Sequence, residues 1–126
     1  MSKNVLKWSK RPVSEDYVAA LGYLTLVVPT PQARRLVNRM RNSRPIKRAA
    51  KDLLRASALP VLSREDAAVA RDLKKIQKGK ALSPVLLVQG DAYKNTLLIV
   101  ADGYHRICAA YHEDESAEVV CLMTNR

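Results

Sequence analysis

Apolar residues recur at helical spacing through the first part of the chain. Between Ser14, a residue type that caps helices, and about Leu26, they stand at i, i+3, i+4 and i+7, which predicts an amphipathic helix. Thr30-Pro31 opens a second helix, with apolar residues on one face and arginine and asparagine on the other. Residues 45–62 fit either a helix or a short strand from Ile46 to Ala49, and the pattern leaves both open.

In the second half of the chain, the spacing of the apolar residues changes from helical periodicity to continuous runs. A helix is predicted from Ser63, as its N-cap, to Gly79, which ends it. Continuous apolar runs of strand length follow at Val85–Val88 and Leu97–Val100, with a turn at Gly90-Asp91 between them. The remaining elements predicted are a helix at Tyr104–Glu113 and a strand at Val119–Leu122.

This order of elements favours an α+β or α/β fold: a small mixed sheet packed by helices, with an N-terminal helical layer. The length of 126 residues fits a single domain spanning 1–126, and the 48% hydrophobic content is enough for one core. Within it the sequence separates a basic helical N-terminal part, 1–62, from a core at 63–126.

Charge is divided unevenly along the chain. Residues 1–80 hold 19 lysines and arginines against 6 acids, whereas residues 81–126 hold 3 against 6. A solvated helix face that keeps the protein soluble is the plain interpretation, but such faces usually mix signs. The density instead predicts a nucleic-acid partner held by backbone contacts. The residues assigned to it are Arg34, Arg35, Arg39, Arg41, Arg44, Lys47 and Arg48.

The cysteine count and the length of the apolar stretches indicate the cellular compartment of the protein. Cys108 and Cys121 are too few for a disulfide framework and lack paired zinc spacing, which indicates a reduced, cytoplasmic protein. The longest apolar stretch, Val18 to Val28, is too short to span a bilayer, so no membrane partner is expected. The sequence does not indicate an oligomeric state.

The segment with the clearest chemistry is LLIVADGYHRICAAYH, a buried strand that breaks at Asp102-Gly103 before a helix. The N-terminus of a helix leaves backbone N–H groups unpaired, and glycine lets an anion approach them closely. Arg106 adds a fixed positive charge and His105 a donor that titrates near neutrality. The pattern predicts a phosphate site, with Asp102 binding a metal or hydroxyl group, or capping the helix.

This segment also allows a purely structural interpretation and two other chemical ones. Asp102-Gly103 can be a strand-to-helix turn with an Asx cap. His105, Cys108 and His112 fall on one face of the helix, so a zinc site or a Cys108 nucleophile is conceivable. Buried free cysteine is common in protein cores, however, so we predict an anion and no metal here.

Residues 72–123 resemble the ParB/sulfiredoxin fold. DLKKIQKGKALSPVLLV is similar to the helix-Gly-Pro-strand unit of ParB-like domains, and LLIVADGYHRICAAY to the strand and Gly-x-x-Arg helix that follow. The resemblance implies a phosphate-binding box for a nucleoside di- or triphosphate with Mg²⁺. By position this box is Gly103, Tyr104, His105 and Arg106.

The box departs from each relative that it resembles. ParB partition proteins have Gly-Glu-Arg-Arg, whereas Tyr104 and His105 stand at the middle positions here, so the resemblance does not imply nucleotide hydrolysis. Sulfiredoxins have Gly-Cys-His-Arg, so Tyr104 replaces their nucleophile. ADP-dependent serine kinases of the same fold have Asp-Gly-His-His-Arg, which implies catalytic roles for Asp102 and His105.

Three hypotheses follow. The first is a ParB-like nucleotide- or nucleic-acid-binding protein that uses the DGYHR box and the basic residues. The second is a small phosphotransferase of the serine-kinase type, with Asp102 and His105 at the reaction centre. The third is a protein-interaction module without catalysis, in which the basic face binds an acidic protein and DGYHR is only a turn. Whether the protein is an enzyme is left open.

Overall fold

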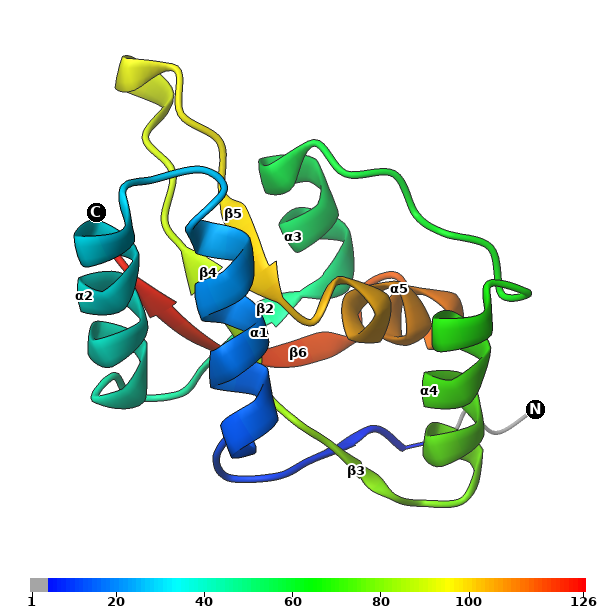
Figure 1. Ribbon diagram of the computed structural model, residues 1–126. Helices are drawn as coiled ribbons and strands as arrows, with labels where there is room; N and C mark the ends of the chain where they lie inside the picture. The colour runs from blue at the N-terminus through cyan, green and yellow to red at the C-terminus, as the bar shows by residue number, and fades with distance from the viewer. Residues whose placement is uncertain (1–4) are drawn as a thin grey trace.

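The computed structural model describes residues 5–126, which form a mixed α/β fold with five α-helices and two sheets (Figure 1). The strands are β1 (Lys7–Trp8), β2 (Ile46–Ala49), β3 (Ala81–Leu82), β4 (Val85–Val88), β5 (Ile99–Asp102) and β6 (Glu118–Thr124). The helices are α1 (Ser14–Leu24), α2 (Thr30–Arg41), α3 (Ala50–Ser57), α4 (Ala67–Gln77) and α5 (Tyr104–Glu113), with a short 3-10 turn, η1 (Ala92–Lys94).

The main sheet has four strands in the order β2-β6-β4-β5. β6 runs parallel to β4, while the β2–β6 and β4–β5 pairs are antiparallel. β1 and β3 form a separate parallel pair, which ties the N-terminal arm to the segment before β4. The sheet is therefore mixed, as the sequence predicts.

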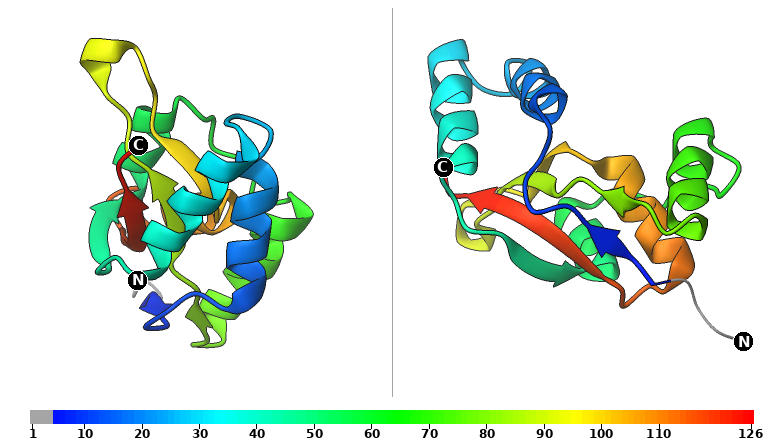
Figure 2. Two further views of the ribbon diagram at one scale, coloured as in Figure 1. Left: turned by 60° about the vertical axis from the view of Figure 1, so that its left-hand side comes forward. Right: turned by 90° about the horizontal axis from the view of Figure 1, so that it is seen from below.

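Helices cover both faces of this sheet. Within β4, Val85 and Leu87 belong to one core cluster, whereas Leu86 and Val88 belong to the other. Because side chains alternate along a strand, this continuous apolar run is buried on both faces. α1 and α2 form the layer on one face, and α3, α4 and α5 lie on the opposite face (Figure 2). The first layer is the predicted N-terminal helical layer.

Residues 45–62 contain both structures that the pattern allowed. Ile46–Ala49 is strand β2, at one edge of the main sheet, and α3 follows it directly. The N-terminal part thus supplies an edge strand and a helix that packs against α5. The strands of the predicted core are joined by this fourth strand.

Several predicted boundaries are wrong. The helix expected from Ser63 begins at Ala67, because the Asp66 side chain accepts hydrogen bonds from the backbone N–H groups of Ala68 and Val69. The first helix ends at Leu24, two residues early. The strand expected at 97–100 lies at 99–102, since the backbone N–H of Leu98 donates to Ala56 of α3 instead.

Candidate anion-binding cleft

Strand β5 passes into helix α5 through Gly103, whose φ of 105° lies in the left-handed region. A Cβ built on Gly103 would lie 2.4 Å from Cγ1 of Val85, so contact between the turn and β4 leaves no room for a side chain. Gly103 is also the N-cap of α5, and no side chain caps this end of the helix. In contrast to α4, which Asp66 caps, α5 begins without a side-chain acceptor.

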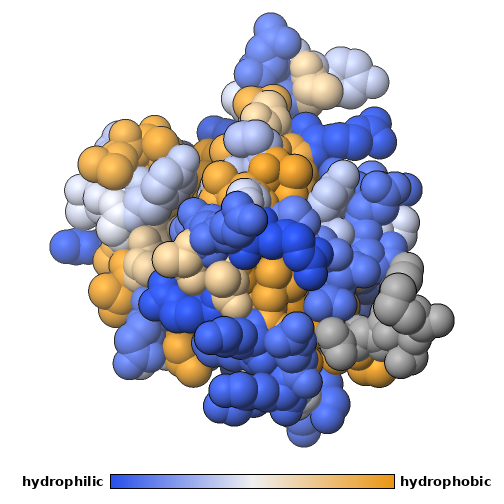
Figure 3. All heavy atoms as spheres, turned by 90° about the vertical axis from the view of Figure 1, so that its right-hand side faces the viewer, coloured by the Kyte–Doolittle hydropathy of each residue, from blue (hydrophilic) through white to orange (hydrophobic). Residues whose placement is uncertain are grey.

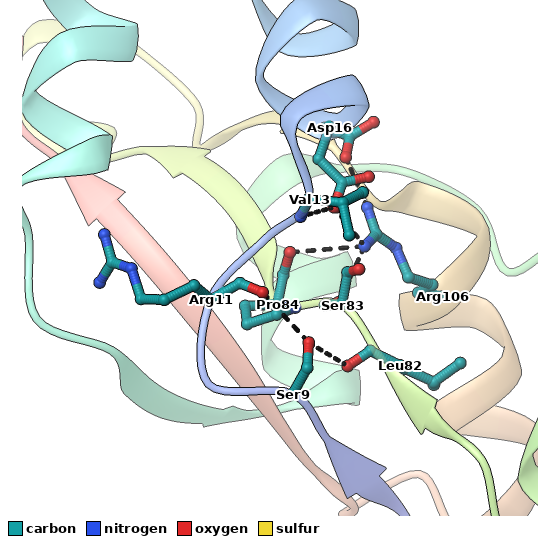
Figure 4. Close-up of polar contacts among 9 residues, drawn as sticks. Ser9, Arg11, Val13, Asp16, Leu82, Ser83, Pro84 and Arg106 are labelled. Carbon is teal, nitrogen blue, oxygen red and sulfur yellow. Dashed lines mark hydrogen bonds and ion pairs between the residues drawn. The ribbon is translucent and has the colours of Figure 1, made fainter.

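Arg106, in the first turn of α5, points toward the segment before β4 and the start of α1, where it meets several acceptors (Figure 4). Its Nη1 donates to the carbonyl oxygen of Ser83 at 2.8 Å and lies 3.4 Å from that of Pro84. Its Nη2 donates to the Asp102 carboxylate at 2.5 Å, and Nη1 lies 3.5 Å from Oδ2 of Asp16. One guanidinium therefore joins α1, β5 and the segment between β3 and β4.

The ion pairs of Arg106 are shielded from water. The three side chains are 12% (Arg106), 16% (Asp16) and 18% (Asp102) exposed. Burial raises the pKa of Asp102 to about 6, a change that Arg106 opposes and the nearby Asp16 carboxylate reinforces. Asp102 consequently changes charge close to neutral pH, while it is bound to a positively charged neighbour.

A cleft of about 380 Å³ opens beside this network, between α1, α4, β3 and the start of α5. It carries both signs of charge. Burial raises the pKa of Asp72, and Lys75, Arg106, His105 and Arg71 oppose that rise. The charged and titratable residues that line the cleft are Asp16, Arg71, Asp72, Lys75, Asp102, His105 and Arg106. On the face shown in Figure 3, polar residues surround smaller hydrophobic areas.

The four residues of the predicted phosphate box lie differently around the cleft. Gly103, His105 and Arg106 line it. His105 is half exposed, with Nε2 4.0 Å from the Asp66 carboxylate that caps α4. Tyr104 is not among the lining residues, and its hydroxyl donates a hydrogen bond to the carbonyl oxygen of Pro60. Tyr104 thus holds the connection between α3 and α4.

Cys108 and His112 hold the same connection. Sγ of buried Cys108 accepts a hydrogen bond from the backbone N–H of Leu62 at 3.5 Å, and Nε2 of His112 lies 2.6 Å from the Leu62 carbonyl oxygen. Burial raises the pKa of Cys108, which disfavours the nucleophilic thiolate. Among residues 5–126, no three His, Cys, Asp or Glu side chains are grouped so as to hold a metal ion.

The predicted nucleic-acid contacts form a second charged region, which we call the basic surface. Its residues follow one another along the exposed face of α2, the turn after it and the edge strand β2. All seven are exposed, and none forms an ion pair within the described part of the chain. They are Arg34, Arg35, Arg39, Arg41, Arg44, Lys47 and Arg48.

Sequence reasoning missed several residues of the cleft. Asp16 is not among the predicted site residues, yet its carboxylate accepts from the backbone N–H of Val13 and pairs with Arg106. Arg71, Asp72 and Lys75 are also absent from the predicted site. A weak signal existed, because the i and i+4 spacing of Arg71 and Lys75 places them on the same side of α4.

Comparison of the chain with protein-family models, curated proteins and solved structures finds no match. No helix within residues 5–126 is long and apolar enough to cross a membrane.

Proposed function

We propose that the protein is a ParB-like domain that binds the phosphate groups of a nucleoside di- or triphosphate in the cleft beside α5. The observation that carries this proposal is the uncapped start of α5 at a cleft that also contains Arg71, Lys75 and His105. Helix N-termini attract anions. The exposed Arg71 and Lys75 can neutralise phosphate charge without breaking any ion pair in the described structure.

The carboxylates divide into two roles in this proposal. Asp16 and Asp102 are bound to Arg106, so they fix the geometry of the cleft. Asp72 has no hydrogen bond or ion pair in the described structure and is half-buried in the cleft wall. Mg²⁺ usually binds one or two carboxylates together with substrate phosphates. Asp72 therefore fits a Mg²⁺ ion that arrives with the nucleotide.

Thermal unfolding with ADP, ATP or CTP and Mg²⁺ tests the proposal. A ligand at about 100 times its Kd adds about 2.7 kcal/mol to stability, which raises Tm by several degrees. Lys75→Ala should weaken binding about tenfold, as expected for one lost charge-assisted contact. Lys74→Ala is the matched control, because Lys74 is exposed on the same helix and does not line the cleft.

Two results would contradict nucleotide binding in the cleft. One is an unchanged Tm with all three nucleotides at millimolar concentration. The other is an equal loss of affinity in Lys75→Ala and Lys74→Ala, which would show that the overall charge of α4 matters and the cleft does not.

We also propose a second function, the binding of a nucleic-acid backbone by the basic surface. The observation that favours it is the single sign of charge: no acid occurs from residue 17 to residue 51, and the seven cations are exposed. Cations that form no ion pair in the described structure can bind a polyanion and release its counterions, so affinity should fall steeply with salt. The aromatic content of 5% offers few side chains for base stacking, which favours phosphate contacts.

Fluorescence anisotropy with a labelled mixed-sequence DNA duplex tests this second function. Affinity should fall by at least about tenfold between 50 and 200 mM salt. Combined replacement of Arg34, Arg35 and Arg39 by Gln should flatten the salt dependence. The control removes the same charge from α4 and the turn after it, at Lys74, Lys78 and Lys80. Absence of binding at low salt, or equal effects of both triple variants, would refute the assignment.

A further inference from the structure

Helix α1 and the turn after it carry an apolar surface that no other part of residues 5–126 covers. Its most exposed large side chains are Val18, 69% exposed, and Leu26, 81% exposed. Tyr23 and Val27 are nearly half exposed. Ala19 and Gly22 lie between them and are also exposed. We call these six residues, 18, 19, 22, 23, 26 and 27, the α1 outer surface. α1 lies at the front of the molecule beside α2 (Figure 1).

This surface is held in a defined shape. Past the end of α1, the backbone N–H groups of Leu26 and Val27 donate to the carbonyl oxygens of Tyr23 and Leu24, each at 3.0 Å. The Thr25 hydroxyl donates to the carbonyl oxygen of Gly22 at 2.7 Å. The exposed apolar side chains therefore project from a hydrogen-bonded turn, so a partner would meet a preorganised surface.

No contact or backbone conformation within residues 5–126 explains why residue 22 is a glycine. It lies within α1 without a positive φ, and a Cβ built on it would meet no atom within 4 Å. Glycine lowers helix stability, and no local contact at this open position requires a glycine. Together with Ala19, Gly22 leaves a shallow step between larger apolar side chains, which permits close approach by another helix.

The border of the surface defines the charge of the partner. The Arg41 guanidinium lies 4.1 Å from the ring centroid of Tyr17, so this flank of α2 faces α1. Arg34, seven residues earlier, lies on the same flank two helical turns away. Residues 17–51 contain no acid, so the border on the α2 side is positively charged, whereas the exposed Glu15, one turn before Val18, is an acid at the N-terminal end of the surface.

We propose that the α1 outer surface binds an amphipathic helix of another protein, with an apolar stripe and acidic residues along its flank. Apolar contact accounts for Val18 and Leu26, and charge complementarity accounts for Arg34 and Arg41. A nucleic acid would use the arginines and leave the apolar residues exposed. A second copy of this chain would bring another positive border. This proposal is independent of nucleotide binding in the cleft, but it shares Arg34 and Arg41 with the basic surface, so the helix and a nucleic acid would compete for these two arginines.

The test uses a fluorescent peptide of about 18 residues with leucines at i, i+3, i+4 and i+7 and glutamates beside them. Anisotropy should show saturable binding to the wild-type protein. Combined Val18→Ser and Leu26→Ser should weaken binding at least about tenfold, because it removes two exposed apolar contacts. Combined Val61→Ser and Tyr93→Ser, at exposed positions elsewhere, is the matched control and should bind normally.

Gly22→Gln separates docking from a structural role. The variant should keep or raise Tm, because glutamine favours helix more than glycine does, yet it should weaken peptide binding about tenfold by filling the step. Unchanged peptide affinity in Gly22→Gln would refute the proposed contact.

Other outcomes also overturn the proposal. They are absence of peptide binding, equal binding of a peptide with the same composition and scrambled leucines, and sedimentation that shows dimers lost in the Val18/Leu26 variant. Loss of duplex binding in that variant would assign the surface to nucleic acid. The Tm response to nucleotides should stay normal in this variant, so failure here is distinguishable from failure of the cleft.

Discussion

Arg106 and Arg34 are both helical arginines, yet the structure gives them opposite surroundings. Arg106 is 12% exposed and contacts two carboxylates and two carbonyl oxygens, whereas Arg34 is exposed and forms no ion pair in the described residues. A buried charge must be paired, and its removal leaves the partner charges buried and unpaired. An exposed one is screened by salt and contributes little to stability. We therefore predict that ligand binding in the cleft depends on the arrangement of its side chains. Binding to the basic surface should depend on the density of positive charge.

Arg106→Ala should give the largest effect on folding. The change leaves Asp16 and Asp102 without their shared cation and removes the link to Ser83, so we expect a loss of about 3–5 kcal/mol. Urea denaturation measures it. Arg106→Lys keeps the charge but cannot make the same set of contacts, and should recover only part of the loss. A cost below about 1 kcal/mol for Arg106→Ala would remove the distinction between the two arginines.

Gly103→Ala should destabilise the cleft by about 3 kcal/mol, because a side chain at φ 105° is strained and its Cβ would overlap Val85. Gly22→Ala is the matched control in open space and should raise stability by up to about 1 kcal/mol. Denaturation midpoints of the two variants should therefore move in opposite directions. Movement in the same direction would contradict the packing argument.

Asp102→Asn should change how stability depends on pH. The folded pKa of Asp102 is raised to about 6 from 3.8, so the folded state binds this proton more tightly than the unfolded state. The contribution is fully present below pH 4 and is lost as pH rises through 6. Relative to the Asn variant, wild type should lose about 2 kcal/mol between pH 4 and 7. A constant difference across this range would contradict a raised pKa.

Arg34→Gln together with Arg35→Gln should give the smallest effect. Both side chains are exposed and unpaired in the described structure, so unfolding free energy should stay within about 0.5 kcal/mol of wild type. The same denaturation measurement checks this. A loss comparable to that of Arg106→Ala would show that the basic surface has a structural role.

The elements predicted correctly are those whose limits depend on residues that are adjacent in the sequence. The α5 helix was predicted with its observed bounds, because Gly103 breaks the strand and apolar residues then recur at helical spacing. The apolar run Val85–Val88 was correctly predicted as a strand. The start of α4 was wrong because Ser63 and Asp66 are both good caps, and only the backbone path shows which of them is used.

The cleft was predicted only in part, because its walls come from distant parts of the chain. The DGYHR segment pointed to Gly103, His105 and Arg106, which do line the cleft. Nothing local pairs Asp16 with Arg106, since ninety residues separate them and the contact exists only after α1 packs on β5. Their contact is a tertiary property, whereas the basic surface was visible in sequence because its residues are neighbours along the chain.

The order β2-β6-β4-β5 also bears on how the protein folds during synthesis. β6, residues 118–124, is the last of the strands in residues 5–126, yet it lies between β2 and β4, and no other strand of this part of the chain pairs with β2. While residues 1–113 leave the ribosome, β2 has no strand to pair with, and the β4–β5 hairpin has an open edge. The sheet can close only when β6 has been synthesised, so most of the cooperative stability should appear after residue 124 has left the ribosome.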